Sequence, residues 1–318
     1  MIDSQAVGSW RFVAYRALTT VAILFSAMLL LFVLSTVVPG NPADTLLGPQ
    51  ASPEYARQFI AQMGLDRPVP ERLLRFFAAL LRGDLGVDVV TGRSVVSLVA
   101  AALPYTLTLT FSAIGLAVLL GIPLGALAAL RPGSWFDHIL AVVSVAVIAI
   151  PSFVIAIALL ITFSLWLNWL PVLAGAGGGG PATLVLPVVA LSVGWIGYIA
   201  RLMRTSLLEV MGEGFIRTSL AYGLPRRVVV FKYALKNAVI PTIAVLGLGV
   251  GQLLGGAVLV EIVFARPGLG KLVLDAINAR NYPVLQGSVF VVVLLFVLTN
   301  LVVDLAYAWI DPRLRSQR

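Results

Sequence analysis

The sequence predicts an all-α, polytopic membrane protein. Of its 318 residues, 60% are hydrophobic and only 11% are charged, and the mean hydropathy is +1.01. In soluble globular proteins about a quarter of the residues are charged. Six apolar segments are long enough to cross a bilayer, which takes about 20 residues in a helix. A polar and basic stretch separates the fourth segment from the fifth.

We expect six transmembrane helices, with ends defined to within about two to four residues. They cover residues 17–38, 103–130, 139–167, 184–203, 239–263 and 289–310. The first is interpreted as a membrane span and not as a cleaved signal peptide. Its apolar run is too long for a signal, and the stretch from Thr36 to Gly40 offers no small-x-small cleavage site. Four prolines are expected to interrupt or begin helices: Pro123, Pro151, Pro187 and Pro241.

Lys and Arg are unevenly distributed along the chain. The stretch 201–238 and both tails are basic, whereas region 39–102 carries both signs of charge. Basic residues favour the cytoplasmic side, and long loops are translocated largely regardless of charge. We therefore expect both termini and 201–238 to be cytoplasmic, and 39–102 and 264–288 to be external. This asymmetry accounts for the net charge of +8 without a nucleic-acid partner.

The chain is expected to have four parts. They are an N-terminal tail with the first span (1–38), an external helical region (39–102), a five-helix membrane core with a polar loop at 209–238 (103–310), and a cytoplasmic tail (311–318). In the external region, Ser52 is a good N-cap and Pro53 suits the first helical position. A second helix is predicted over 70–82, ending at Gly83. Five side chains are expected on one apolar side of it: Leu73, Leu74, Phe77, Leu80 and Leu81. The glycine-rich segment 175–180 is expected to be flexible.

Several kinds of chemistry are excluded or disfavoured. The absence of cysteine excludes thiol catalysis, and a single histidine, His138, cannot build a histidine metal cluster. His138 and Asp137 are interpreted as a solvated surface pair. The nearest match to a phosphate-binding loop, 266–271, lacks the first glycine and the final Ser or Thr. The chain is therefore expected not to be an ATPase or any other enzyme.

Ion-driven carriers usually place ionisable residues inside their spans. The candidates here are Glu261 and Asp304, both near span ends, which argues against transport powered by this chain alone. A sodium site made of backbone carbonyls would leave little trace in the sequence. A self-contained secondary carrier or channel and a non-transporting membrane scaffold therefore stay open as alternatives.

The polar loop reads as two short helices joined by a turn. Residues 209–222 are compatible with a helix that Gly223 can stop, and Leu224-Pro225 begins another that continues through Lys236. Basic and apolar residues alternate along both. Such a loop can dock a soluble partner or bind anionic lipid.

The spacing within this loop resembles a known family. Arg217-Thr-Ser-Leu-Ala-Tyr-Gly223-Leu, followed by Ala234-Leu-Lys-Asn-Ala-Val-Ile-Pro241, is similar to the coupling-loop motif of ABC importer permeases, although Ser219-Leu-Ala221 replaces its Glu-Ala-Ala. Further stretches are similar to the B-type subunit of dipeptide/oligopeptide (peptide/nickel) permeases. They lie at 34–42, 64–68, 82–86, 91–95, 261–270, 281–287 and 304–312. The resemblance thus extends over nearly the whole chain.

The resemblance implies a type I permease subunit of an ATP-driven importer of di- or oligopeptides in the bacterial plasma membrane. Its partners would be a second homologous permease, two cytoplasmic ATPases that bind ATP-Mg, an external substrate-binding protein and membrane lipid. This chain itself would carry no cofactor, metal or catalytic residue. Nickel or glutathione import is the alternative within the same family.

The helix around 217–223 would dock in a groove on an ATPase, with Gly223 supplying the turn. From the residue types we expect Phe215, Leu220 and Leu224 to make the apolar contacts. The candidate coupling residues are Glu213, Phe215, Arg217, Thr218, Leu220, Ala221, Gly223 and Leu224.

Polar or amphipathic residues within the spans are candidates for the translocation path. They are Trp195, Tyr198, Gln252 and Asn300, and each is equally well explained as a packing or interface residue. Gly247, Gly251 and Gly255 recur every four residues and are expected to let another helix approach closely.

Overall fold

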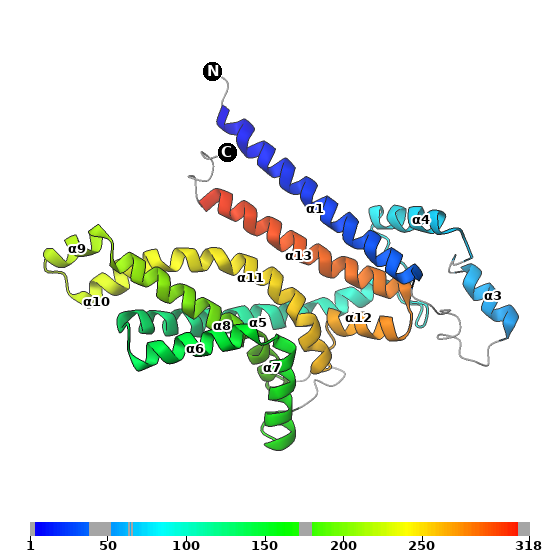
Figure 1. Cartoon of the computed structure of the whole chain (residues 1–318). Helices are drawn as coiled ribbons and strands as arrows, with labels where there is room; N and C mark the ends of the chain where they lie inside the picture. Colours follow the sequence, from blue (N-terminus) through cyan, green and yellow to red (C-terminus); the bar gives the residue numbers. More distant parts are fainter. Residues whose placement is uncertain (1–3, 38–51, 63, 65, 172–179, 311–318) are drawn as a thin grey trace. The chain divides into compact units, whose positions relative to one another are not determined.

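The computed structural model describes residues 4–37, 52–62, 64, 66–171 and 180–310 and is built from helices (Figure 1). This confirms the predicted all-α class. In the described part, extended pairing is limited to one isolated bridge between Val87 and Ser94. The expectations for the glycine-rich segment and for the tail 311–318 lie outside the described residues.

The chain divides into two compact units. One comprises Met1–Thr106 with Pro267–Arg318, and the other comprises Leu107–Arg266. In this division, residues 267–310 group with the N-terminal part and not with the remainder of 103–310.

In the first unit, α1 (Ser4–Val37) packs along α13 (Tyr282–Ile310), and α12 (Leu269–Asn278) also packs on α13. Their core includes the first turns of α5 (Val95–Leu130). The Thr106 hydroxyl accepts a buried hydrogen bond from the Leu269 backbone N–H at 2.9 Å. The buried members of this core are small or branched: Val95, Val99, Ala102, Leu269, Ala276 and Val284.

A buried carboxylate organises the segment before α5. Asp88 accepts hydrogen bonds from the Val90 N–H at 2.9 Å, from the Thr91 hydroxyl and from the Asn281 side chain at the start of α13. Burial acts to raise the pKa of Asp88, but these hydrogen bonds outweigh it and hold the pKa below its ordinary value. The segment is therefore fixed to the α12–α13 connection.

Both helices expected in region 39–102 are present, as α3 (Pro53–Gln62) and α4 (Val69–Leu81). Gly83 follows α4 with φ +73°, which explains the predicted stop. The predicted apolar side of α4 is confirmed at Phe77, which stacks on Phe25 of α1, but the predicted set was incomplete and is not covered throughout. Leu74 and Leu81 are 73% and 89% exposed, whereas Phe76, missing from the prediction, packs against Phe32 of α1 with ring centroids 5.7 Å apart.

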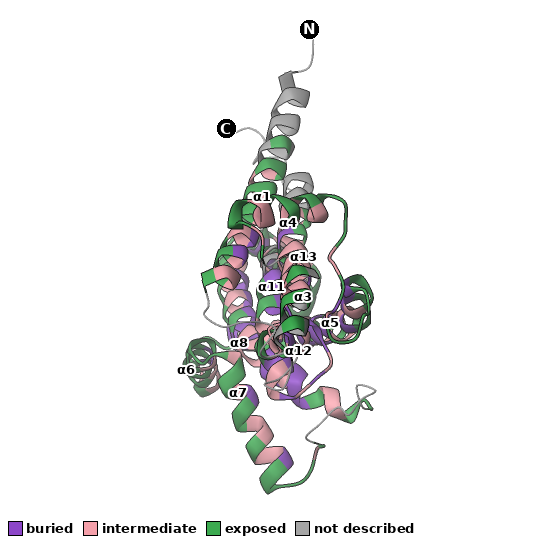
Figure 2. Ribbon diagram, turned by 90° about the vertical axis from the view of Figure 1, so that its right-hand side faces the viewer, coloured by how far each residue is buried: buried purple, intermediate pink, exposed green. Residues whose placement is uncertain are grey.

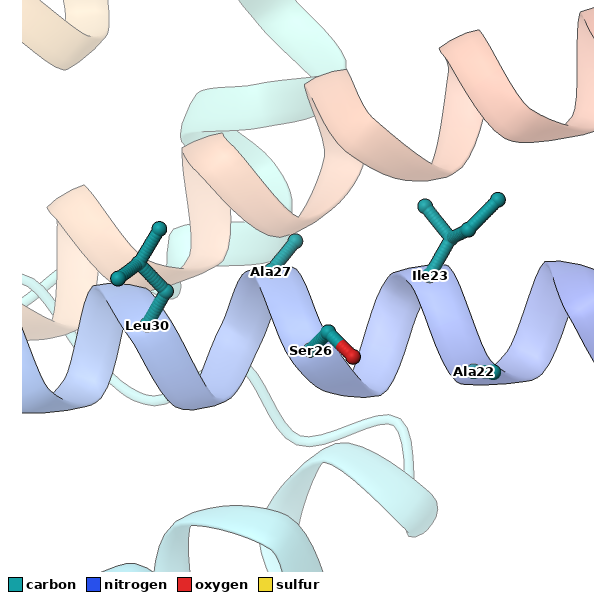
Figure 3. Close-up of a pocket in the computed structure, with 5 residues that line it drawn as sticks. All are labelled: Ala22, Ile23, Ser26, Ala27 and Leu30. Carbon is teal, nitrogen blue, oxygen red and sulfur yellow. The ribbon is translucent and has the colours of Figure 1, made fainter.

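One face of α1 is left uncovered. Five small or aliphatic residues line a shallow apolar groove along it (Figure 3): Ala22, Ile23, Ser26, Ala27 and Leu30. A surface of this composition is compatible with lipid or with another transmembrane helix.

In the second unit, α8 (Ala182–Met211) is the central helix. It packs against α6 (Trp135–Ala149), α7 (Ser152–Leu159) and α11 (Leu235–Val263), and it is lined with buried residues (Figure 2). Glycines bring its neighbours close. A Cβ atom on Gly125 of α5 would lie 2.2 Å from the Ala200 carbonyl oxygen, and one on Gly197 would lie 2.8 Å from Val147 of α6.

The expected six spans are only partly reproduced. Among the residues that the structure describes, five helices are long and apolar enough to cross a membrane, or six if one bent pair counts as a single span. That pair replaces the expected span 139–167. Its halves, α6 and the segment Ser152–Trp166, meet at an angle of 100° beside Pro151, which has no N–H to continue the helix. The second half ends in the π-helix η1 (Leu160–Trp166).

The other three prolines were predicted to interrupt or begin helices, and this prediction was wrong. Pro187 lies inside α8, Pro241 lies inside α11, and α5 continues through Pro123. The prediction of a close helix approach was wrong at Gly255. A Cβ atom on Gly255 would meet nothing within 4 Å, whereas one on Gly249 would meet the Trp195 ring at 2.6 Å.

We predict that Gly125→Ala destabilises the protein by about 1–3 kcal/mol, because the added methyl group meets backbone that must move. Thermal unfolding in detergent measures the effect. Gly115→Ala is the matched control on the same helix, because nothing lies within 4 Å of its Cβ position, and it should leave the unfolding midpoint nearly unchanged. Equal midpoints for the two variants would refute the close contact.

Candidate functional site

The candidate site is a hairpin of residues 212–234, which we call the basic hairpin. It contains α9 (Gly214–Ala221), α10 (Arg226–Val228) and the π-helix η2 (Val229–Ala234) (Figure 1). The sequence predicted one helix over 209–222. The structure instead ends α8 at Met211 and begins α9 at Gly214, with Glu213 in extended conformation at the N-cap.

Gly223 makes the turn of the hairpin, as predicted. Its φ is +78°, the left-handed region that disfavours side chains. The Leu224 N–H donates to the Ser219 carbonyl at 3.3 Å, and the Gly223 N–H donates to the Leu220 carbonyl at 3.0 Å. This pair of bonds is the Schellman arrangement, which satisfies the last carbonyls of a helix.

The hairpin is anchored to the helices on either side of it. Ile216 is 1% exposed and Val229 is fully buried, and both pack with Met203 and Leu207 of α8. Leu224 is half-buried against the same cluster. Leu224 therefore points inward as an anchor, which differs from its expected place among the outward apolar contacts. A displacement of α9 would be passed directly to α8 and α11.

The outer surface of the hairpin is apolar with basic residues around it. Phe215 and Leu220 are exposed, as expected. Two further exposed aromatic residues were not predicted: Tyr222, which is 84% exposed, and Phe231. Phe215 and Tyr222 are seven residues apart, a spacing that places side chains on one helical face and that could have identified Tyr222. The exposed basic residues are Arg217, Arg226, Arg227 and Lys232.

Polar side chains of α9 bond mainly within the hairpin. The Arg217 guanidinium donates to the Gly212 carbonyl at 3.2 Å, and the Thr218 hydroxyl donates to the Gly214 carbonyl at 3.0 Å. Ser219 bonds the Phe215 carbonyl in the same way. Ala221 is exposed at the end of the helix. The surface that remains for a partner is therefore largely the apolar one.

A partly buried ion pair lies upstream of the hairpin, between Asp137 of α6 and Arg204 of α8. Asp137 is 3% exposed and accepts two hydrogen bonds from Arg204, one of them 2.7 Å long from Nη2 to Oδ2. The Gly133 N–H donates to Asp137 at 2.9 Å. The predicted solvated pair of His138 and Asp137 was therefore wrong. The exposed His138 ring instead contacts the Ser134 carbonyl through Nδ1.

The candidate path residues lie in different surroundings. Trp195 and Tyr198 of α8 meet edge to face with ring centroids 5.6 Å apart. Trp195 also packs on Gly249 of α11, and Gln252 follows Gly249 by about one turn and is exposed. Asn300 is half-buried on α13, in the other unit. The structure thus supports a packing role for Trp195 and leaves Tyr198 and Gln252 accessible.

Among the described residues, no group of three or more His, Cys, Asp or Glu side chains lies close enough together to hold a metal ion. The ionisable Glu261 is buried near the end of α11, where its backbone carbonyl accepts a hydrogen bond from the Arg266 N–H at 2.9 Å.

Comparison with known proteins gives two family matches that together cover most of the chain. Residues 121–316 match the model of the binding-protein-dependent transport system inner membrane component, and residues 9–110 match the model of its N-terminal part. The chain is 38% identical to a probable peptide ABC transporter permease of Sinorhizobium fredii, over 96% of this chain and 99% of the relative.

Two further relatives are permeases that are named for different substrates. A probable D,D-dipeptide transport system permease of Escherichia coli is 37% identical, over 96% of this chain and 97% of the relative. A glutathione transport system permease of Escherichia coli is 35% identical, over 96% and 98%.

We predict that Gly223→Ala loosens the hairpin by about 1 kcal/mol, because alanine in the left-handed region costs roughly that amount. Hydrogen exchange of the amides at 219–224 should then be about fivefold faster. Gly223→Asn should have a smaller effect, since asparagine tolerates this conformation. Gly214→Ala is the control, because nothing lies within 4 Å of its Cβ position. Unchanged exchange in Gly223→Ala would contradict the assigned turn.

We predict that Asp137→Ala and Arg204→Ala each destabilise the protein by about 2–3 kcal/mol, because each removes one partner of a charged hydrogen-bonded pair. The double variant should cost clearly less than the sum. Thermal unfolding of the four proteins measures this coupling. Asp275→Ala, which removes an exposed pair with Lys271, should change stability by less than about 0.5 kcal/mol. Strict additivity at 137 and 204 would show that the pair is not coupled.

Proposed function

The chain belongs to the family of binding-protein-dependent transport system inner membrane components, and we propose that its basic hairpin couples peptide import to ATP hydrolysis by partner subunits. As a member of this family it is a multi-pass membrane permease subunit of an ABC importer, and it is not the ATPase. It works within a multi-subunit transporter that includes an ATPase and a binding protein.

The observation that carries the proposal is the two-sided construction of the hairpin. Ile216 and Val229 hold it against α8 and α11, while Phe215 and Leu220 face outward. An ATPase groove that receives the outward residues would move the inward ones with it. The remaining coupling residues contribute differently: Arg217 and Thr218 close local hydrogen bonds, and Gly223 provides the turn. Glu213 and Ala221 lie at the two ends of α9.

The partner set that we propose is a second homologous permease, two ATPases that bind ATP-Mg, and a substrate-binding protein. The ATPases would sit on the cytoplasmic side with the basic hairpin and both termini, and the binding protein would sit on the opposite side. The uneven distribution of Lys and Arg supports this orientation. It follows that region 39–102 and residues 264–288 face the binding protein.

Peptides are the substrate class that we propose. Relatives carry the names peptide, D,D-dipeptide and di/tripeptide permease, at 35–38% identity over nearly the full chain. A permease for glutathione, which is itself a small peptide derivative, is similarly related. Tyr198 and Gln252, which are accessible on neighbouring helices, are our candidates for the translocation path in the unit 107–266. Asn300 is the candidate in the unit formed by 1–106 and 267–318.

We predict that Leu220→Glu lowers retention of the ATPase subunits at least tenfold, because a buried charge replaces an apolar contact in the groove. The tagged chain is purified from gently solubilised membranes, and the eluate is assayed for ATPase subunits and activity. Leu81→Glu is the matched control, because Leu81 is equally apolar, more exposed, and on the proposed opposite side. It should retain the ATPases.

Retention of the ATPases by Leu220→Glu would show that α9 is not the docking helix. A wild-type chain purified without any ATPase would overturn the coupling proposal altogether. Uptake of a labelled dipeptide, with unlabelled dipeptide or glutathione as competitor, tests the substrate class. If glutathione competed and unlabelled dipeptide did not, glutathione and not peptides would be assigned as the substrate.

A further inference from the structure

A basic pocket of about 320 Å³ lies within the unit formed by 1–106 and 267–318. Pockets that hold small ligands measure about 300–1,000 Å³. Its polar lining includes three guanidinium groups, and its walls are aromatic. These residues are Arg67, Arg72, Arg75, Phe32, Phe76 and Tyr282.

The positive charge in this pocket exceeds the negative charge. Glu71 accepts a hydrogen bond from Arg67 at 2.8 Å and lies 3.0 Å from Arg75. The hydrogen bond from Arg67, together with the charges of both arginines, holds the pKa of Glu71 below its ordinary value. Glu71 therefore stays ionised and offsets one of the three positive charges. Arg72 lies over the Phe32 ring, 5.9 Å from its centroid.

The pocket lies beside the end of two apolar helices. Phe32 is five residues before the end of α1, and Tyr282 is the first residue of α13. The two helices are tied there by a hydrogen bond from Gln286 to the Ser35 hydroxyl at 3.4 Å. Five residues of helix span about 7.5 Å. The pocket is thus near the level at which the α1 span meets the polar surface of a bilayer.

The adjoining helix α4 has the composition of a helix that lies in a membrane interface. Phe77 stacks on Phe25 of α1 with ring centroids 4.7 Å apart, which places α4 against the apolar part of α1 (Figure 1). Leu74 and Leu81 remain exposed, and Arg72 and Arg75 lie on the same helix. Helices with leucine and phenylalanine on one face and arginine on the other lie at the boundary between headgroups and acyl chains.

We propose that this pocket binds the phosphodiester headgroup of an anionic phospholipid. Arginine presents paired N–H donors that match phosphate oxygens. The acyl chains attached to that headgroup would cover Leu74 and Leu81, which a free phosphate ion would leave exposed to water. The bound lipid would hold α4 at the membrane surface next to α1. The proposal goes beyond peptide transport and needs no assignment of the side on which the pocket faces.

The whole transporter complex is purified, stripped of lipid and titrated with dioleoyl phosphatidylglycerol or dioleoyl phosphatidylcholine, and bound lipids are counted by native mass spectrometry. We predict that Arg72→Gln with Arg75→Gln weakens phosphatidylglycerol binding by about fivefold for each arginine removed. Glu71→Gln should strengthen it, because the uncharged side chain no longer offsets the guanidinium charges. A gain of binding cannot arise from misfolding.

Arg57→Gln with Arg82→Gln is the matched control, because both residues are exposed arginines in the same region but do not line the pocket. It should bind phosphatidylglycerol as the wild type does. If the control variant lost as much phosphatidylglycerol binding, the effect would be one of overall charge. That result would overturn the proposed binding site. Displacement of the lipid by inorganic phosphate alone would assign the pocket to a free anion instead.

The Arg72→Gln, Arg75→Gln variant could instead keep its lipid and lose the binding protein. That result would assign the pocket to a protein contact and overturn the lipid proposal. ATPase retention is recorded in the same samples. Loss of lipid from a complex that keeps its ATPases supports the proposal independently of the coupling experiment.

Discussion

Close backbone contact around α8 is the constraint on which the second unit depends. At Gly125, Gly197 and Gly249 a side chain of any size would collide with a neighbouring helix or ring. In a bilayer the hydrophobic effect does not drive helices together, so association relies on van der Waals contact at such positions. Helices α5, α6 and α11 all meet α8 in this way. The four helices therefore move as one rigid body.

This body gives the basic hairpin a mechanical connection to the membrane helices. The hairpin is short and contributes few buried residues of its own, but Ile216 and Val229 insert beside Met203 and Leu207 of α8. The Asp137–Arg204 pair adds a polar link from α8 to α6 close to the same end. A force applied to α9 therefore reaches three helices through contacts that are already formed.

The sequence predicted those features that depend on local chemistry. Hydropathy located the apolar helices, Ser52-Pro53 and Gly83 marked the helices of region 39–102, and Gly223 marked the turn of the hairpin. Features that depend on neighbours in space were missed. The partner of Asp137 is 67 residues away, and hydropathy contains no information on such pairing. Pro151 was correctly expected to interrupt or begin a helix, but the 100° bend of the span was not predicted, because length and apolarity are the same for a straight span and a broken one.

The Asp137–Arg204 pair also bears on how the protein is made. Asp137 leaves the ribosome 67 residues before Arg204, so a newly inserted α6 carries an unpaired carboxylate until α8 arrives. Burying an unpaired carboxylate is costly, which disfavours any arrangement in which the Asp137 end of α6 is buried before α8 is in place. The pair therefore favours an order of assembly in which α8 joins α6 before the Asp137 end of α6 becomes buried.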